Sequence, residues 1–482
     1  MEAPASGGFG RIRQIIRLFG SHAEHVPTTN TKTLFQEKKV MRVLMMMDPT
    51  EELRESAFAA SRKQSGAIAK RPEKLSSRIE LDSEFAAVPI SRMGATAMAA
   101  TADPEHATKF VVRGNMDADQ LSEIDDEQGV GLFADPMISN YDGGYCARAP
   151  VGSSQDVARN LQVQRLQERG LDGAGVGVVI CDTGINIEHL REKGLDPRFD
   201  DSLTWIPPGV GGSPGSFSVD HGTMCAYDAL IAAPQATLLD FPILLSQTPG
   251  GSAMDGFLSD ALQAFSTLAT YMRQPEADRA YKSLIINNSW GMYHPSWDFP
   301  AGHPGRYADN PGHPFNLVVG TLARTGADIF FAAGNCGPDC PADRCEGVIR
   351  QSITGANAHP EVTTVAGVTT NRQWIGYSSV GPAIDGMADR KPDIACYSHF
   401  LGSEAFGRGV ADTGTSTACP VAAGVTAAFR TVLDQSVLSP RDLARELRRD
   451  AKVPGSRYGN RWNEKFGYGV INPAQTAQRL LP

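Results

Sequence analysis

Short apolar runs alternate with amphipathic stretches along most of the chain after residue 156. The apolar runs predict strands at 176–181, 237–244, 283–290, 328–335 and 362–368. The stretches between them predict helices at 221–233, 257–272, 316–325 and 416–433. Strands that alternate with helices are usually parallel and are covered on both faces. The pattern therefore predicts an α/β fold built on a doubly wound, mostly parallel sheet.

A smaller unit precedes this region. The run VMRVLMMM at 40–47 predicts a strand, and the residues from Glu51 onward predict a helix. Residues 109–138 predict a strand, an Asp-capped helix and a second strand. We therefore expect a small α+β domain at 41–140.

The remaining boundaries follow from composition. Residues 1–40 mix small, polar and basic residues without sustained periodicity, which predicts a flexible tail. A basic helix over Arg11–Phe19 is the less favoured alternative, because nine residues form a marginal helix on their own. The Gly- and Ser-containing segment 141–156 predicts an exposed, cleavable linker, and the large domain is expected to cover 157–482.

Charge and composition exclude several classes of protein. The chain has 482 residues, with 45 Lys and Arg against 54 Asp and Glu, so its formal charge of −9 argues against a nucleic-acid binder. No run approaches the ~20 apolar residues that a membrane span needs. The N-terminus lacks the apolar core of a secretory signal, so we expect a cytoplasmic location with reduced thiols, with non-classical export left open.

Two residues with catalytic potential occur early in the large domain. Asp182 follows the apolar strand VGVVIC directly, at the end of the strand where open α/β sheets place functional groups. His221 begins a helical stretch and is followed by a glycine that permits close approach of another chain. Taken alone, Asp182 is more often a turn residue and His221 a surface residue.

Two further candidates occur later. Ser416 lies at the start of the helix that follows Asp-Thr-Gly-Thr, where the backbone amides favour a developing oxyanion. Asn335 ends the apolar strand before it and carries an amide donor. Taken alone, Ser416 is more often a helix N-cap and Asn335 a turn residue. Their order with the earlier pair, Asp, His, Asn, Ser, is one of the known arrangements of an Asp/His/Ser triad.

The motifs around these residues resemble those of subtilisin-like serine proteases, the subtilase family. The matching segments are VVICDTG at 178–184, HGTMCA at 221–226, NNSWG at 287–291, AAGN at 332–335, YSSVGP at 377–382, KPDI at 391–394, GTSTACPVAAG at 414–424 and GYGVIN at 467–472. The resemblance implies a subtilisin-like fold and a serine endopeptidase.

The resemblance also implies roles for single residues. Ser416 is expected to be the nucleophile, His221 the general base and acid, and Asp182 the group that orients the imidazole. Asn335 is expected to form the oxyanion hole with the Ser416 amide. The segment Ser289, Trp290 and Gly291 is expected to pair with the backbone of a protein or peptide substrate and to line its pocket.

The family also suggests a role for the N-terminal domain and a place for metal. Subtilases commonly carry a propeptide that assists folding and blocks the cleft, so the domain at 41–140 is expected to act as an intramolecular inhibitor and chaperone. No organic cofactor is expected. Structural calcium is possible in this family, but no residues of this chain are assigned to it, and no catalytic metal is expected.

The cysteines leave several alternatives. Cys225, four residues after His221, is either a small buried hydrophobe or the thiol that makes some subtilases sensitive to mercurials. Cys336, Cys340 and Cys345 crowd the loop after Asn335. They predict reduced thiols or one disulfide rather than a partial zinc site.

Two other functions compete. Asp-Thr-Gly occurs at 182–184 and again at 412–414, which is the pattern of a pepsin-like aspartic protease. That family is all-β, however, and it leaves His221 and Asn335 without a role. A non-catalytic binding protein on the same fold is the second alternative, because a fold does not prove activity.

Overall fold

The structure is a computed structural model that describes residues 40–90, 103–124, 131–140, 149–245, 255–456 and 461–481. All of these belong to one unit, Lys39–Pro482. The predicted tail lies outside the described residues except for Val40, and so does the alternative helix at 11–19. Within the described part of the chain, none of the helices has the length and apolar character needed to cross a bilayer.

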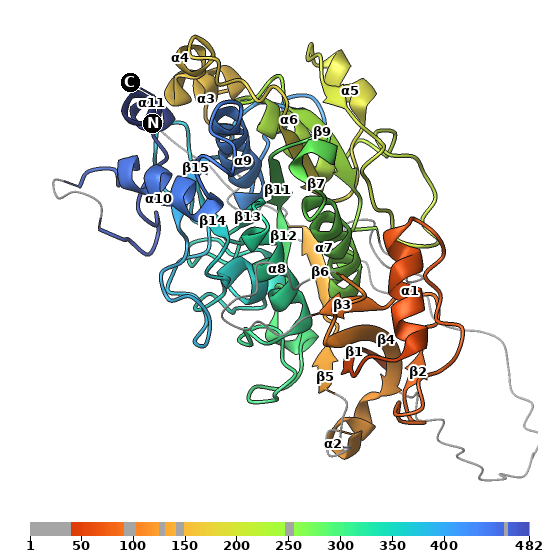
Figure 1. Cartoon of the computed structure of the whole chain (residues 1–482). Helices are drawn as coiled ribbons and strands as arrows, with labels where there is room; N and C mark the ends of the chain where they lie inside the picture. Colours follow the sequence, from red (N-terminus) through yellow and green to blue (C-terminus); the bar gives the residue numbers. More distant parts are fainter. Residues whose placement is uncertain are drawn as a thin grey trace, which may run out of the picture. The chain divides into compact units, whose positions relative to one another are not determined.

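A seven-stranded sheet forms the centre of the fold (Figure 1), in the order β15-β14-β13-β11-β7-β9-β8. Its strands are β7 Gly177–Cys181, β8 Arg198–Phe199, β9 Thr237–Phe241, β11 Leu284–Asn288, β13 Asp328–Ala332, β14 Thr363–Val368 and β15 Ile394–Tyr397. Every neighbouring pair is parallel. The predicted α/β class with a mostly parallel sheet is therefore confirmed.

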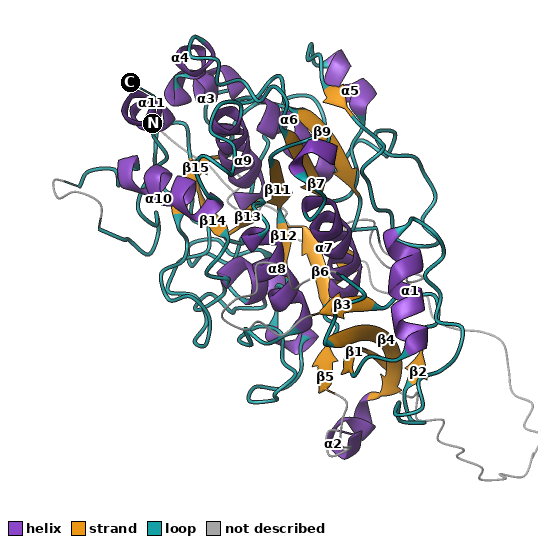
Figure 2. Ribbon diagram, viewed as in Figure 1, coloured by secondary structure: helices purple, strands orange, loops and turns teal. Residues whose placement is uncertain are grey.

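Helices cover both faces of this sheet (Figure 2). Alternate side chains of a strand point to opposite faces, so Val178 and Ile180 enter one core while Val179 and Cys181 enter the other. The first core is closed by α6 His221–Leu230 and α9 Thr415–Arg430, and the second by α7 Leu258–Met272 and α8 Pro314–Arg324. This two-faced burial explains why the strands read as continuous apolar runs. The other helices are α3 Ser154–Leu161, α4 Val163–Gln167, α5 Ile187–Glu192, α10 Pro440–Asp450 and α11 Pro473–Leu480.

The N-terminal region forms an antiparallel sheet in the order β2-β4-β1-β5, with β3 paired to β4. Its elements are β1 Val40–Met47, α1 Glu51–Ser61, β2 Glu80–Leu81, β3 Val88–Ile90, β4 Lys109–Asp117, α2 Leu121–Ile124 and β5 Gly131–Ala134. Residues such as Leu53 and Phe110 close a core of its own, whereas Leu44 and Val111 join the core that α7 and α8 close. The α+β character predicted for 41–140 is present, and this region shares buried surface with the rest of the unit.

A third sheet joins the N-terminal region to the rest of the chain. Strand β6, Met137–Asn140, lies between β10, Asp255–Phe257, and β12, Trp290–Gly291, and is antiparallel to both. Ser139 stands opposite Asp255 on one side and Gly291 on the other.

Two contacts dock the segment before β6. Asp135 accepts a hydrogen bond from the Ser259 amide at 2.7 Å, in the first turn of α7. His313, the N-cap residue of α8, contacts the Ala134 carbonyl through Nε2 at 2.9 Å. The free amides and the dipole at a helix start favour a carboxylate such as Asp135. The amino ends of two helices therefore hold β5 and the turn into β6.

Helix α3 begins at Ser154, inside the segment 141–156 that we predicted to be a linker. The reason is a capping box, in which the Asp156 carboxylate accepts hydrogen bonds from both the amide and the hydroxyl of Ser153, each at 2.9 Å. Ordered structure of the large domain therefore starts before residue 157. Residues 141–148 lie outside the described part of the chain.

Candidate active site

Asp182 directly follows β7, at the carboxyl edge of the sheet. Its side chain is fully buried, and its Oδ1 accepts a hydrogen bond from the Thr183 amide at 2.8 Å. The Asp182 amide continues the sheet by donating to the Phe241 carbonyl at 3.1 Å. The carboxylate is thus fixed by the strand that delivers it.

His221 is the first residue of α6, and Asp220 caps this helix. The His221 Nδ1 atom lies 2.8 Å from Asp182 Oδ1, and the side chains of His221 and Asp182 are 2% and 0% exposed. The approach is possible because Gly222 has no side chain: a Cβ there would lie only 2.4 Å from the Gly184 carbonyl. The structure therefore brings together the first two predicted site residues.

Ser416 is the second residue of α9 and is fully buried. Its Oγ donates to the Ser289 carbonyl at 3.1 Å, while Ser289 Oγ donates to the Ser416 carbonyl at 2.9 Å. Helix α9 crosses α6 closely, since a Cβ on Gly424 would lie 2.1 Å from the Ala229 carbonyl. The Ser416 carbonyl lies 3.6 Å from Cys225 Sγ, one turn into α6, so the amino ends of the two helices lie close together.

Cys225 connects these groups. Its Sγ lies 3.6 Å from Asp182 Oδ2, 3.8 Å from His221 Nδ1 and 3.6 Å from the Ser416 carbonyl. Burial, and then the Asp182 charge, raises the pKa of this thiol well above its usual value. This shift favours the neutral thiol over the thiolate. The sequence already indicated that this thiol could lie near His221, because Cys225 follows His221 by four residues in a predicted helix.

Asn335 lies in the turn that follows β13. Its Oδ1 accepts hydrogen bonds from the Thr415 amide at 2.9 Å and from Thr415 Oγ1 at 3.0 Å. These two bonds fix the side chain at the start of α9, one residue from Ser416, and they assign the amide nitrogen to the opposite side. The structure thus places Asn335 beside the nucleophile candidate.

In the segment Ser289, Trp290 and Gly291, the main chain and the Trp290 side chain make different kinds of contact. The main chain of Trp290 and Gly291 pairs with Asn140 and Ser139, as expected for a segment that binds an extended chain. The Trp290 ring is fully buried and packs edge-on against Phe331, with ring centres 5.2 Å apart. The indole is therefore part of the hydrophobic core that α7 and α8 close.

Sequence reasoning missed that two buried carboxyl groups, Asp228 on α6 and Asp412 before α9, lie close to each other. Asp228, on α6, is completely buried, and burial followed by the charge of Asp412 raises its pKa well above the usual value. Burial also raises the pKa of Asp412 to about 6, although Ser403 donates two hydrogen bonds to it, each 2.6 Å long. Asp412 therefore has Asp228 as a carboxyl neighbour. Asp182 instead contacts His221 and Cys225.

The cysteine-rich loop after Asn335 contains a disulfide between Cys336 and Cys345. Cys340 is also disulfide-bonded. The predicted alternative of one disulfide is therefore only partly right, because all three cysteines of the loop are disulfide-bonded, and none of the three sulfurs is a thiolate ligand for zinc. The expected reduced state does not hold for these three residues.

Two groups of three metal-ligating side chains occur within the described ranges. One is Asp182, His221 and Cys225, and the other is Asp103, Glu105 and His106. Calcium prefers six to eight oxygen ligands, so neither group fits it.

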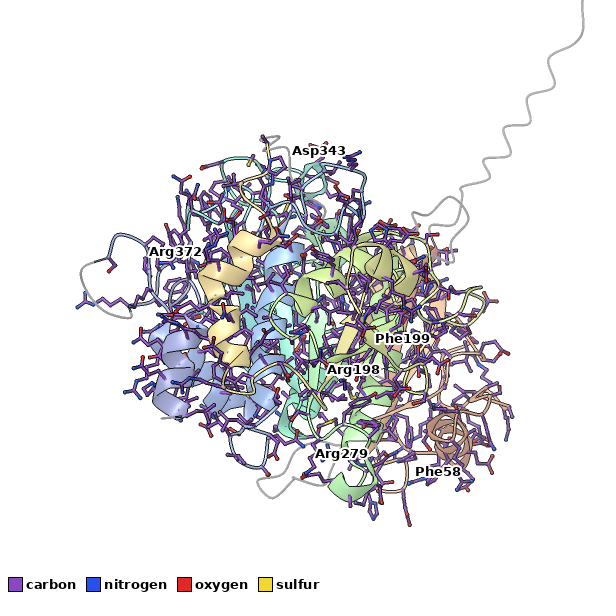
Figure 3. All side chains as sticks on the ribbon, turned by 90° about the horizontal axis from the view of Figure 1, so that it is seen from above. Phe58, Arg198, Phe199, Arg279, Asp343 and Arg372 are labelled. Atoms are coloured by element: carbon purple, nitrogen blue, oxygen red, sulfur yellow. A yellow bond between two sulfur atoms is a disulfide. The ribbon has the colours of Figure 1, made fainter. Side chains whose placement is uncertain are left out.

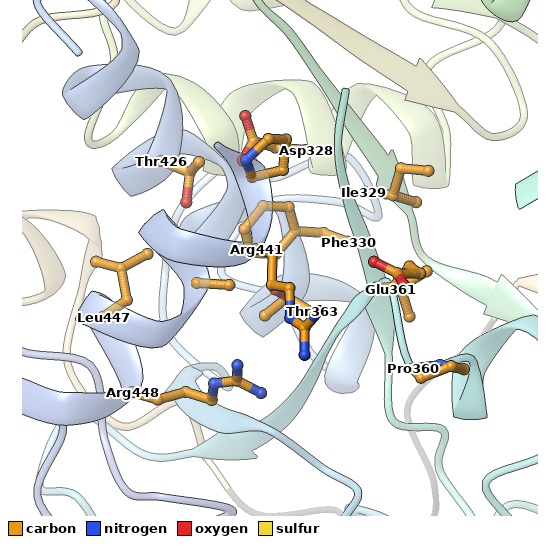
Figure 4. A pocket seen from close by; sticks show the side chains of 13 residues that line it. Asp328, Ile329, Phe330, Pro360, Glu361, Thr363, Thr426, Arg441, Leu447 and Arg448 are labelled. Atoms are coloured by element: carbon orange, nitrogen blue, oxygen red, sulfur yellow. The ribbon is translucent and has the colours of Figure 1, made fainter. Parts of the chain in front are cut away.

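A cavity between β13, β14 and α10 lies apart from these residues (Figure 4). It is lined by Asp328 and Thr363, the first residues of β13 and β14, and by Arg441 and Arg448 of α10. Asp182 and Asn335 follow the opposite, carboxyl ends of their strands. The cavity therefore opens at the other edge of the sheet.

Comparison with known proteins identifies the family. A family model for the subtilase family matches residues 173–469, more than half of the chain. The chain therefore belongs to the subtilase family. This membership, together with the parallel sheet, makes the pepsin-like hypothesis wrong.

Similar proteins carry protease names. The chain is 26% identical over 340 residues to subtilisin-like protease 3 of Pseudogymnoascus destructans, covering 69% of this chain and 72% of that protein. It is 25% identical over 330 residues to furin-like protease 1 of Drosophila melanogaster, covering 64% of this chain and 27% of that protein. It is 25% identical over 348 residues to human membrane-bound transcription factor site-1 protease, covering 68% and 28%. The chain thus spans about a quarter of the length of the last two relatives.

Proposed function

We propose that this protein is a serine endopeptidase that uses Asp182, His221 and Ser416 as its catalytic triad. The observation that carries the proposal is the buried hydrogen bond of 2.8 Å between Asp182 and His221. Ser416 stands at the amino end of α9, the helix packed against the one that begins with His221. Family membership supports the same assignment.

The reaction follows from these positions. The Ser416 hydroxyl redirects its hydrogen from the Ser289 carbonyl to His221 Nε2, and its oxygen attacks the substrate carbonyl. Asp182 stabilises the imidazolium through Nδ1, and His221 then passes the proton to the leaving amine. Water hydrolyses the acyl-enzyme by the same steps in reverse, which restores Ser416.

The negative charge on the carbonyl oxygen needs donors that are already in place. We assign Asn335 Nδ2 and the Ser416 amide to this role. Because Thr415 holds the Asn335 carbonyl oxygen with two hydrogen bonds, the amide nitrogen needs no reorganisation during the reaction.

The N-terminal region is proposed to be an intramolecular inhibitor. An extended peptide substrate adds a strand to an exposed sheet edge, and here β6 occupies that place between β10 and β12. Ile138 of β6 is completely buried in the core that Trp290 shares. The reacting bond would lie among the residues that directly follow Asn140, within the segment predicted to be cleavable.

Intact-mass analysis of freshly folded full-length protein tests this function. We expect a cut shortly after Asn140 and hydrolysis of casein, both abolished in Ser416→Ala and both unchanged in Ser436→Ala, a control at an exposed serine. Casein hydrolysis that persists in Ser416→Ala would refute the nucleophile. Absence of both reactions in the folded wild-type protein would favour the non-catalytic binding alternative.

Substrates and location are further proposals. We propose that protein or peptide chains are the substrates, recognised through backbone pairing at β10 and β12. The cytoplasmic location remains a prediction, to be tested by cell fractionation. Structural disulfides are typical of oxidising compartments. Because the protein contains the Cys336–Cys345 bond, the fractionation should compare the cytoplasmic fraction with the exported fraction.

A further inference from the structure

The loop that follows Asn335 contacts β6, the strand that we propose takes the place of a substrate. Arg344 Nη1 donates hydrogen bonds to Ser139 Oγ on β6 and to Asp255 Oδ1 on β10, the latter at 2.7 Å. Ser139 and Asp255 are partners across the two strands. One guanidinium therefore joins the bound strand to the strand that binds it.

The loop is built to hold this arginine. Arg344 immediately precedes Cys345, whose disulfide to Cys336 closes the loop next to Asn335. The Ala342 amide also donates to the Asn335 carbonyl at 2.8 Å. Figure 3 shows neighbouring Asp343 at the margin of the molecule in that view. Arg344 is thus anchored to the same residue that we assign to the oxyanion hole.

A second side chain contacts the bound strand at the next position. Tyr293 donates from its hydroxyl to the Asn140 carbonyl at 3.1 Å, and the Arg344 guanidinium lies 6.0 Å from the centre of its ring. Ile138, on the other side of Ser139, points into the core, so Ser139 faces away from it. Ser139 is nevertheless completely buried, and its hydroxyl oxygen accepts the hydrogen bond from Arg344.

We propose that Arg344, held by Asp255, is a specificity-determining residue that closes over an extended peptide and selects the side chain at the Ser139 position. This inference rests on the proposed function. A guanidinium has only donors, so it favours a small side chain with an acceptor oxygen, such as Ser or Thr. Lys or Arg at this position would bring a second cation with no acceptor and would be rejected.

Hydrogen exchange in full-length protein with Ser416→Ala tests the contact without any need for catalysis. We expect Ser139→Ala and Arg344→Ala each to accelerate amide exchange in 137–140 by about 10-fold, the scale of a hydrogen bond to a charged group. The double variant should be no faster than Arg344→Ala alone, because Ser139→Ala removes a bond that Arg344→Ala has already removed. Arg350→Ala, at an exposed arginine close in sequence, is the matched control and should have no effect.

A charge test addresses selectivity. Ser139→Lys should accelerate exchange more than Ser139→Ala, and Arg344→Ala should partly reverse this by removing the repelling cation. Additive effects of Ser139→Ala and Arg344→Ala, or a Ser139→Lys effect that Arg344→Ala does not reduce, would overturn the proposal. Exchange reports on the contact even if the protein has no peptidase activity, so the two failures are distinguishable.

Discussion

We predict that His313, which contacts the N-terminal region through the Ala134 carbonyl, makes the stability of the protein dependent on pH. Its imidazole is completely buried between the rings of Phe133 and Tyr307, with ring centres 5.6 and 5.1 Å away. Nε2 donates to the Ala134 carbonyl, and Nδ1 accepts from the Phe315 amide at 3.3 Å. Both nitrogens are therefore used by the neutral ring. A second proton on Nδ1 would replace an acceptor by a donor, at a helix start that disfavours positive charge.

Burial lowers the pKa of His313 from 6.5 to about 4. The unfolded chain thus binds the proton more tightly, so stability is complete above pH 6.5 and is lost as the pH falls toward 4. At about 1.4 kcal/mol for each tenfold change in proton affinity, the full loss is about 3 kcal/mol, of which about 2 kcal/mol has been lost by pH 5.

Urea unfolding of the full-length Ser416→Ala protein at pH 7.5 and pH 5 measures this loss. In the His313→Gln variant the side-chain amide replaces the donor at Nε2 and does not titrate. Between pH 7.5 and pH 5, the unfolding free energy of this variant should therefore fall by about 2 kcal/mol less than that of the protein with His313. His106→Gln is the control at an exposed histidine, whose pKa is raised by a hydrogen bond to Asp103. If the unfolding free energies of the protein with His313 and of the His313→Gln variant depended equally on pH, this reasoning would be refuted.

Three further outcomes follow from the site. Cys225→Ala should keep its activity in p-chloromercuribenzoate while the wild type loses it, because mercury on Sγ would lie beside Asp182; full sensitivity of the variant would contradict this. Asn335→Ala should lower kcat by ~10²–10³-fold with a smaller change in KM, measured with casein peptides, if its amide stabilises the oxyanion. Asp228→Asn should lose less unfolding free energy than the wild type between pH 5 and pH 9. The raised pKa of this carboxyl in the folded state makes wild-type stability fall as pH rises, whereas asparagine stays neutral.

The sequence predicted the elements that carry the triad candidates because they are determined by local pattern. Strand β7 and helices α6 and α9 are strongly apolar and are bounded by glycine or capping residues, so the sequence positions of Asp182, His221 and Ser416 relative to them could be deduced. The same holds for β1, which matches the predicted 40–47.

Other features depend on contacts between distant segments. The pairing of β6 with β10 and β12 joins short strands with little periodicity, so no local signal predicts it. The contacts of Arg344 could not be predicted either, since its partners Ser139 and Asp255 are far away in the sequence. Trp290 was expected to line a substrate pocket, but its ring contributes to the core because β12 turns it toward Phe331.

Labelling with a fluorophosphonate probe tests the assignment of Ser416 most directly. The full-length protein, with and without limited trypsin treatment to remove β6 from the cleft, should gain one probe mass on the peptide that contains Ser416. Ser416→Ala should gain none. Folded protein that remains unlabelled after the N-terminal region has been removed, or a label on another serine, would contradict the catalytic triad.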